Sequence, residues 1–335
     1  MRWLAWVLVA GCGAGGPGEA VLDAGAGTQA DGAAGDAAED GGAWSGTVAT
    51  AKSTVHALAA SGTAVAWVER DGERSRLMRI GDGGAPAELS QADYPTPAWG
   101  SQAWLFMDQG AIVWTWPGQG TIRRIAGGAE AVIAEPEGLS GLAVGPEHVY
   151  WTEHGAGKVW RAPLSGGASE NIAAVEYPTG VVAGPDGLFV IDRLDARMIR
   201  YELDGSDPTT WATWPGDNTM RLSGGEGHLV WSDNSNGKLM AMPRAGGEPV
   251  VVAEGAATMD GDVAVGEGVV VVAPGEWDFD RTVRVWPLPG AGTREGTDEP
   301  TVVGHPGEGC GARVTVAGGA VLWSRCDGRI EAHGL

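Results

Sequence analysis

The chain has 335 residues and a formal net charge of −21, with 22 Lys and Arg against 43 Asp and Glu. Because binding to phosphates needs clustered basic side chains, this composition argues against a nucleic-acid partner. Glycine (57 residues) and tryptophan (16) are abundant, whereas phenylalanine (3) and tyrosine (4) are scarce. These proportions indicate many tight turns and large rings packed at recurring positions, which is typical of a repetitive β protein.

The first ten residues, MRWLAWVLVA, hold one positive charge and an apolar run too short to span a bilayer. The next residues complete Val9-Ala10-Gly11-Cys12, which resembles the lipobox of bacterial lipoproteins. The resemblance implies that residues 1–11 are a signal peptide and that Cys12 is acylated, for example with palmitate. Cys12 would then anchor the chain to a membrane of the cell envelope, facing the periplasm or at the outer membrane. An ordinary secretion signal with a chance cysteine is the alternative.

Residues 12–45 form the second segment, in which Gly, Ala and acidic residues predominate and Lys and Arg are absent. Such a composition cannot bury enough apolar surface to fold, so we predict a disordered linker. A chain of this length reaches roughly 30 Å as a flexible coil. The linker would therefore hold a folded domain, residues 46–335, clear of the lipid headgroups.

One β unit recurs through residues 46–335 at a spacing of about forty residues. Its most regular run reads AVAWVE, AIVWTW, VYWTE, LFVID, LVWSD, VVVVAP and VLWSR. The position shared by these runs is occupied by Trp67, Trp114, Trp151, Val190, Trp231, Val272 and Trp323. Seven units of this spacing predict seven blades of a β-propeller.

Each unit continues with a second run, such as KVWRAPL, a glycine-containing turn such as Gly127-Gly128, and a third run, such as EAVIAE. Runs of four to six residues between turn signals are typical of strands, and the spacing leaves no room for helices. The predicted fold is therefore all-β, with four-stranded antiparallel blades.

The last unit ends at Leu335 without its outer strand, while GTVATAK (46–52) resembles an outer strand with no unit before it. We predict that residues 46–52 pair with residues 329–333 and close the ring. In the same blade, pairing Val316 with Val321 would place Cys310 nearly opposite Cys326, within disulfide reach. Two free buried cysteines are the alternative.

The run Val149-Tyr150-Trp151-Thr152-Glu153 resembles the signature of YWTD propellers, and Gly184-Pro185-Asp186-Gly187 is similar to turns of NHL-type and streptogramin-lyase-type propellers. The acid that follows the tryptophan recurs only as Glu69, Glu153, Asp192 and Asp233. YWTD propellers usually have six blades, so seven units favour the broader superfamily. The resemblance implies that ligands bind where the loops between blades meet around the axis.

No catalytic or metal-binding motif stands out, and we expect no cofactor and no metal site. The loops on the face where propellers usually bind carry exposed aromatic and charged residues, which suit recognition of a protein, a peptide or an envelope polymer. The candidate binding residues are Tyr94, Tyr177, Asp192, Arg193, Asp217, Arg221, Asp233, Trp277, Arg313 and Arg325.

The leading hypothesis is a membrane-tethered binding module without enzymatic activity. The alternative is a periplasmic enzyme, similar to a lyase or lactonase, with a cation-assisted site at the axis, such as one that uses His154 with Glu153 or Glu176. Convergence of carboxylates and a histidine at the central mouth would favour the enzyme. The oligomeric state stays open.

Overall fold

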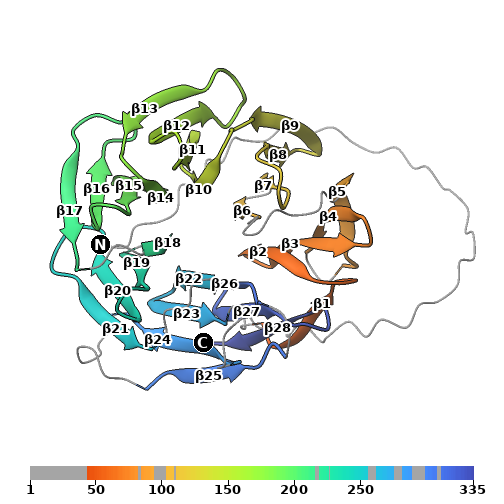
Figure 1. Cartoon of the computed structure of the whole chain (residues 1–335). Helices are drawn as coiled ribbons and strands as arrows, with labels where there is room; N and C mark the ends of the chain where they lie inside the picture. Colours follow the sequence, from red (N-terminus) through yellow and green to blue (C-terminus); the bar gives the residue numbers. More distant parts are fainter. Residues whose placement is uncertain are drawn as a thin grey trace, which may run out of the picture. The chain divides into compact units, whose positions relative to one another are not determined.

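The seven repeated units fold into seven blades, each a four-stranded antiparallel sheet, arranged in a ring (Figure 1). The computed structural model describes residues 44–81, 84–93, 103–108, 111–215, 219–225, 227–255, 262–274, 281–288, 299–307 and 311–335. The described residues contain strands and turns and no helix, and so no helix able to cross a membrane. The predicted all-β propeller with seven blades is confirmed.

The innermost strand of each blade runs beside the axis, and side chains link several of these strands across blades. Ser140 donates a hydrogen bond to the carbonyl of Pro178 at 2.9 Å, and Thr179 donates one to the carbonyl of Thr219 at 3.1 Å. The innermost strands are β2 (Val55–Ser61), β6 (Leu105–Asp108), β10 (Leu139–Val144), β14 (Pro178–Gly184), β18 (Thr219–Gly224), β22 (Asp262–Gly266) and β26 (Val314–Ala317).

The second strand of each blade is its most buried element, because both of its faces pack against neighbouring blades. Trp67, Trp114 and Trp231 at the repeated position are fully buried. This double burial explains why these strands are continuous apolar runs instead of alternating ones. They are β3 (Ala64–Asp71), β7 (Ala111–Thr115), β11 (His148–Glu153), β15 (Gly187–Asp192), β19 (His228–Asp233), β23 (Val269–Ala273) and β27 (Ala320–Ser324).

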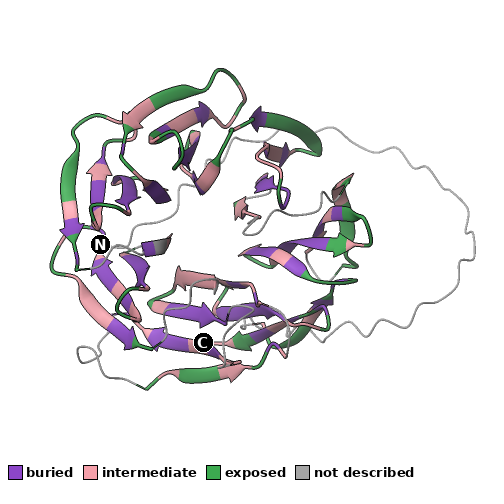
Figure 2. Cartoon of the chain, viewed as in Figure 1, coloured by how far each residue is buried: buried purple, intermediate pink, exposed green. Residues whose placement is uncertain are grey.

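The third strands join the buried second strands to the outer ones, which carry most of the exposed strand residues (Figure 2). The third strands are β4 (Arg74–Ile80), β8 (Ile122–Ala126), β12 (Lys158–Pro163), β16 (Arg197–Tyr201), β20 (Lys238–Pro243), β24 (Val283–Pro287) and β28 (Arg329–Gly334). The outer strands are β5 (Ala87–Asp93), β9 (Ala129–Ala134), β13 (Glu170–Ala174), β17 (Thr209–Thr213), β21 (Val250–Glu254), β25 (Thr301–Gly304) and β1 (Gly46–Thr50).

Every outer strand carries a bulge, in which one extra residue has no partner on the third strand. A bulge turns the extra side chain against the alternation of the strand. Here each extra side chain is apolar and packs into the core between two blades, and each of the seven cores receives one. The extra residues are Val48, Leu89, Ile133, Ile172, Trp211, Val252 and Val303.

The blade that closes the ring contains strands from both ends of the folded region. Strand β1 pairs antiparallel with β28, with Thr47 opposite Glu331 and Thr50 opposite Arg329. Its bulge matches those of the other six outer strands, and a core of buried residues, including Trp67 and Leu322, joins this blade to the first. The predicted closure is present as the pairing of Gly46–Thr50 with β28, so this blade has no missing outer strand.

The predicted pairing of Val316 with Val321 is also present. Cys326 follows β27 and is disulfide-bonded. Cys310 lies outside the described residues, so its pairing with Cys326 stays a prediction.

Candidate functional site

One face of the ring carries the hairpins between second and third strands and the connectors that lead from each outer strand to the next blade. We call it the connector face. Seven predicted binding residues can be placed there or at the adjoining strand ends, whereas Tyr94, Asp217 and Trp277 lie outside the described residues, as does Cys12. The seven are Tyr177, Asp192, Arg193, Arg221, Asp233, Arg313 and Arg325.

The acids at or near the ends of the second strands point into the protein and hold the connectors. Asp192 is fully buried and accepts hydrogen bonds from the backbone amide of Tyr177 at 3.3 Å and from Arg197 at 3.1 Å. Glu69 and Glu153 bind the connector amides of Lys52 and Glu137 in the same way, each at 3.2 Å. The recurring acid therefore fastens one blade to the chain arriving from the previous blade.

Asp233 reaches its connector through a second side chain. Its carboxylate, 3% exposed, accepts a hydrogen bond from the side chain of Asn236 at 2.8 Å, and that amide also donates to the carbonyl of Pro215 at 2.6 Å. Asp192 and Asp233 are therefore buried and bonded within the propeller, and their contact with a partner stays a prediction.

The predicted arginines outside the fourth blade also contact the protein itself. Arg313 donates from Nε to the carbonyl of His56 at 2.8 Å, which links the last blade to the first. Arg325 donates to the carbonyl of His305 at 3.0 Å and so contacts its connector. Arg221 is half-buried on the innermost strand β18.

The structure does bring Tyr177 and Arg193 together. Tyr177 lies on the connector between β13 and β14, and its carbonyl accepts a hydrogen bond from the backbone amide of Arg193 at 3.0 Å. The guanidinium carbon of Arg193 lies 5.6 Å from the centre of the Tyr177 ring, and the His154 ring lies 5.1 Å from it. The backbone amide and carbonyl of Tyr177 both bond residues of the hairpin between β15 and β16, which holds the Tyr177 backbone beside that hairpin.

The neighbouring side chains make this cluster accessible from solvent. His154 is exposed, Tyr177 and Arg193 are half-buried, and Leu194 beside Arg193 is 55% exposed, an unusual exposure for a large apolar residue here. We call these four residues the Tyr177 patch. It combines an aromatic ring, a cation near that ring and an exposed apolar group, and such groups contribute most strongly at protein interfaces.

His154 and Leu194 are absent from the set of binding residues predicted from the sequence. The signal for His154 is present in the repeats, because His154 follows Trp151 at the same distance as Arg193 follows Val190. Aligned repeats therefore place His154 and Arg193 on neighbouring hairpins, with the Tyr177 connector between the two blades. Leu194 follows from the same alignment as an apolar residue at a hairpin tip.

The alternative of an axial cation site requires converging ligands. Within the described part of the chain, no group of three or more His, Cys, Asp or Glu side chains is placed to hold a metal ion. His56 lies on an innermost strand, and its pKa is lowered to about 4 by burial and by the charges of Arg313 and Arg70. His56 is therefore neutral at neutral pH.

No protein-family model matches the chain, and no curated protein matches its sequence. Among solved structures, the chain is similar to virginiamycin B lyase from Staphylococcus aureus, with 14% identity and a TM-score of 0.62 over 85% of this chain and 96% of that one. It is also similar to a chain of the mitotic checkpoint complex, with 12% identity and a TM-score of 0.62 over 92% and 99%. The computationally designed Ika8 protein matches with 13% identity and a TM-score of 0.53 over 86% and 98%.

These three structures include an enzyme, a component of a protein complex and a designed protein. At identities this low, the likeness establishes the fold alone, since one fold supports many functions. The chain is a seven-bladed β-propeller that resembles virginiamycin B lyase in its fold.

Proposed function

We propose that this propeller is a binding module of the cell envelope that contacts a protein or peptide through the Tyr177 patch. The observation that carries the proposal is the position of Tyr177: its backbone amide donates to Asp192, its carbonyl accepts from Arg193, and its ring contacts Arg193 and His154. A side chain held in place before binding loses little conformational freedom when a partner arrives. The fold likeness to a chain of the mitotic checkpoint complex is consistent with a role in binding a protein.

The chemistry of the patch favours a partner with both an apolar and a polar group. Leu194 supplies exposed apolar surface, and the ring of Tyr177 contacts the side chains of Arg193 and His154. Tyrosine and arginine are enriched among the residues that dominate binding energies at interfaces. We therefore expect a peptide or protein surface with an aliphatic or aromatic anchor next to backbone or carboxylate oxygens.

Tethering is the second part of the proposal. The Val9-Ala10-Gly11-Cys12 motif supports acylation of Cys12, and residues 13–45 supply a linker of small and acidic residues. A lipid-anchored chain of this kind would hold the propeller near a membrane surface without crossing it. The folded domain would then meet partners in the cell envelope.

Site-specific photo-crosslinking tests the binding proposal. A benzophenone amino acid replaces Leu194 in the patch or, as a matched control, Leu335 at the end of β28 on the opposite face, where the side chain is 51% exposed. The two positions have similar exposure, so random collisions label both. The proposal predicts a discrete crosslinked partner from Leu194 that Tyr177→Ala removes; equal labelling from both positions would refute it.

A further inference from the structure

The hairpin between β19 and β20 in the fifth blade contains the one Asn-Gly pair of the chain, Asn236-Gly237. The chain has four asparagines, and the other three precede Ile172, Thr219 and Ser235. An asparagine side chain loses ammonia when the backbone nitrogen of the next residue attacks it, and glycine permits this attack most readily because it has no Cβ. Asn236-Gly237 is therefore the pair at which the sequence most favours deamidation.

The attacking nitrogen of this pair has no acceptor within the folded hairpin. Among the described residues, none accepts a hydrogen bond from the Gly237 amide, and Asn236 beside it is exposed. The equivalent amides of the two preceding blades, those of Gly157 and Ala196, donate to carbonyls of their own hairpins at 3.3 and 3.4 Å. The Gly237 nitrogen can therefore lose its proton to hydroxide without breaking a hydrogen bond of the hairpin.

The amide group of Asn236 holds the hairpin to the connector between the fourth and fifth blades. Its nitrogen donates to the carbonyl of Pro215 at 2.6 Å and to the carboxylate of Asp233 at 2.8 Å. Asp233 is 3% exposed, and the other described donor to its carboxylate is the backbone amide of Asn236, at 3.2 Å. A carboxylate in place of the Asn236 amide would remove both side-chain bonds and place a second negative charge beside a buried one.

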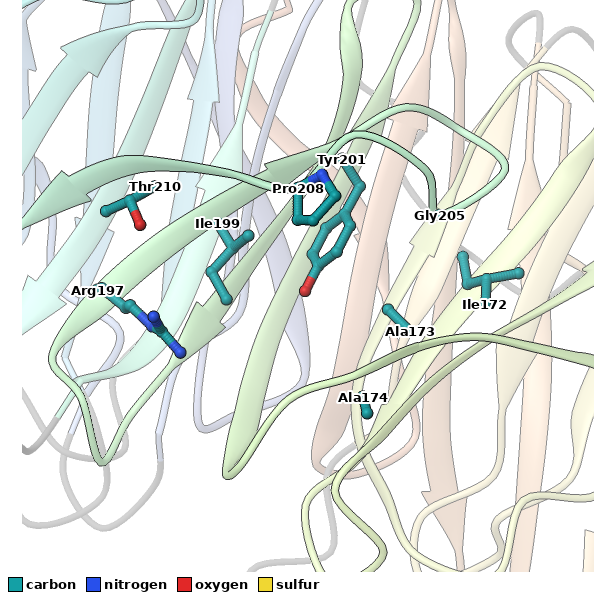
Figure 3. Close-up of a pocket in the computed structure, with 9 residues that line it drawn as sticks. All are labelled: Ile172, Ala173, Ala174, Arg197, Ile199, Tyr201, Gly205, Pro208 and Thr210. Atoms are coloured by element: carbon teal, nitrogen blue, oxygen red, sulfur yellow. The ribbon is translucent and has the colours of Figure 1, made fainter.

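The fourth blade shows what an acid at this position requires. Asp195 stands one repeat before Asn236, and one nitrogen of Arg197 lies 2.9 Å from the carboxylate of Asp195 and 3.1 Å from that of Asp192. Arg197 lies on β16 at the wall of a pocket of about 440 Å³ between the third and fourth blades (Figure 3). One guanidinium thus neutralises both acids of this hairpin.

The fifth blade lacks this compensation. Lys238 takes the place of Arg197, and its side-chain nitrogen lies 3.7 Å from the carboxylate of Glu254 on the outer strand β21. A lysine is a single point charge and does not bridge two carboxylates as the planar fork of an arginine does. An acid at position 236 would therefore repel Asp233 without a shared cation.

We propose that Asn236 is a deamidation site and that its conversion releases the hairpin from the connector between the fourth and fifth blades. The deprotonated Gly237 nitrogen bonds to Cγ of Asn236 while the bond from Cγ to Nδ2 breaks, and Nδ2 takes a proton from water and leaves as ammonia. Water then opens the cyclic imide at either carbonyl carbon, which gives aspartate or isoaspartate. The reaction consumes one water and releases one ammonia. It shares no residue with the Tyr177 patch, so this inference does not rest on the proposed function.

Peptide mass spectrometry of the full-length protein, before and after incubation of the folded protein in mildly alkaline buffer, tests the modification. The peptide with Asn236-Gly237 should gain the mass of an amide-to-acid change and contain isoaspartate, whereas the peptide with Asn171 should stay unchanged. Gly237→Ala should suppress the reaction and keep the hairpin, because Ala196 has a φ of +46° at the equivalent position. Reaction of the urea-unfolded chain but not of the folded protein, or an undiminished rate in Gly237→Ala, would overturn the proposal.

Thermal unfolding and hydrogen exchange test the release. Asn236→Asp, which reproduces one product, should lower the melting temperature by about 5 °C and speed exchange of the hairpin amides, because the buried Asp233 carboxylate loses a donor and gains a like charge. Addition of Lys238→Arg rebuilds the arrangement of the fourth blade and should restore most of this loss, while Lys238→Arg alone should change nothing. An unchanged melting temperature in Asn236→Asp, or a loss that Lys238→Arg does not reduce, would contradict the release.

Discussion

Replacing Glu69 by alanine should strongly destabilise the closed ring. The Glu69 carboxylate is 1% exposed and accepts hydrogen bonds from the indole of Trp67 at 2.7 Å and from the backbone amide of Lys52 at 3.2 Å. It also forms an ion pair with Arg76. Lys52 belongs to the connector that follows β1, so this one side chain joins the closing blade to the first blade. Glu69→Ala leaves three donors without their acceptor.

The expected cost follows from these contacts. Removing one partner of a buried ion pair costs about 3–5 kcal/mol, because the other charge stays buried without compensation. Arg76 is 11% exposed and keeps Glu88 at 3.2 Å and Asp71 at 3.5 Å, which places the cost at the lower end, about 3 kcal/mol. For a domain of this size, that lowers the melting temperature by roughly 6–12 °C.

Thermal and urea unfolding monitored by circular dichroism would measure this change. Glu88→Ala is the matched control, because it removes a carboxylate that is 37% exposed from the same arginine. An exposed pair contributes at most about 1 kcal/mol, so the control should melt within a few degrees of the unmodified protein. If Glu69→Ala costs no more than Glu88→Ala, the connector does not depend on the buried acid and the reasoning fails.

Three further predictions concern closure, pH and anchoring. Deletion of residues 46–52 removes the outer strand β1 and part of the core between the last and first blades, so calorimetry should show loss of most of the stability; an unchanged melting temperature would contradict ring closure. The pKa of His56 is lowered from 6.5 to about 4 in the folded protein, so the unfolded chain binds the proton first as the pH falls. The free energy of unfolding should therefore decrease by roughly 3 kcal/mol from above pH 6.5 to below pH 4, and His56→Asn should flatten this slope in urea titrations. Mass spectrometry of protein from membranes should find a lipid-modified Cys12 at the N-terminus, and Cys12→Ser should release the propeller from the membrane; an unmodified Cys12 would refute the anchor.

Much of the fold could be predicted because a repeat imposes the same packing on each unit. The position shared by Trp67 and Trp231 is buried between blades, so the same large residue recurs in five of the seven runs. The closing strand was recognisable because the last unit lacks an outer strand and residues 46–52 have no unit before them. Repeats of this kind predict topology from local patterns alone.

The details that form sites depend on contacts between blades, which no local pattern displays. In the sequence, the bulge at Ile172 is visible only as two consecutive apolar residues, Ile172 and Ala173. The pocket beside it forms only where the third and fourth blades meet, because Gly205 of the fourth blade approaches Ile172 of the third. Asp192 is the last residue of a buried strand, and from the sequence alone it cannot be distinguished from a binding residue at the start of a hairpin. Only its bonds to Tyr177 and Arg197 show that it stabilises the connector.

The most direct test of the central claim is the affinity of the partner crosslinked at Leu194, measured by isothermal titration calorimetry on the isolated proteins. Tyr177→Ala keeps the backbone bonds to Asp192 and Arg193 while removing the ring, so we predict at least about tenfold weaker binding with an unchanged melting temperature. Equal affinities for the unmodified protein and Tyr177→Ala would show that the connector face binds elsewhere or not at all.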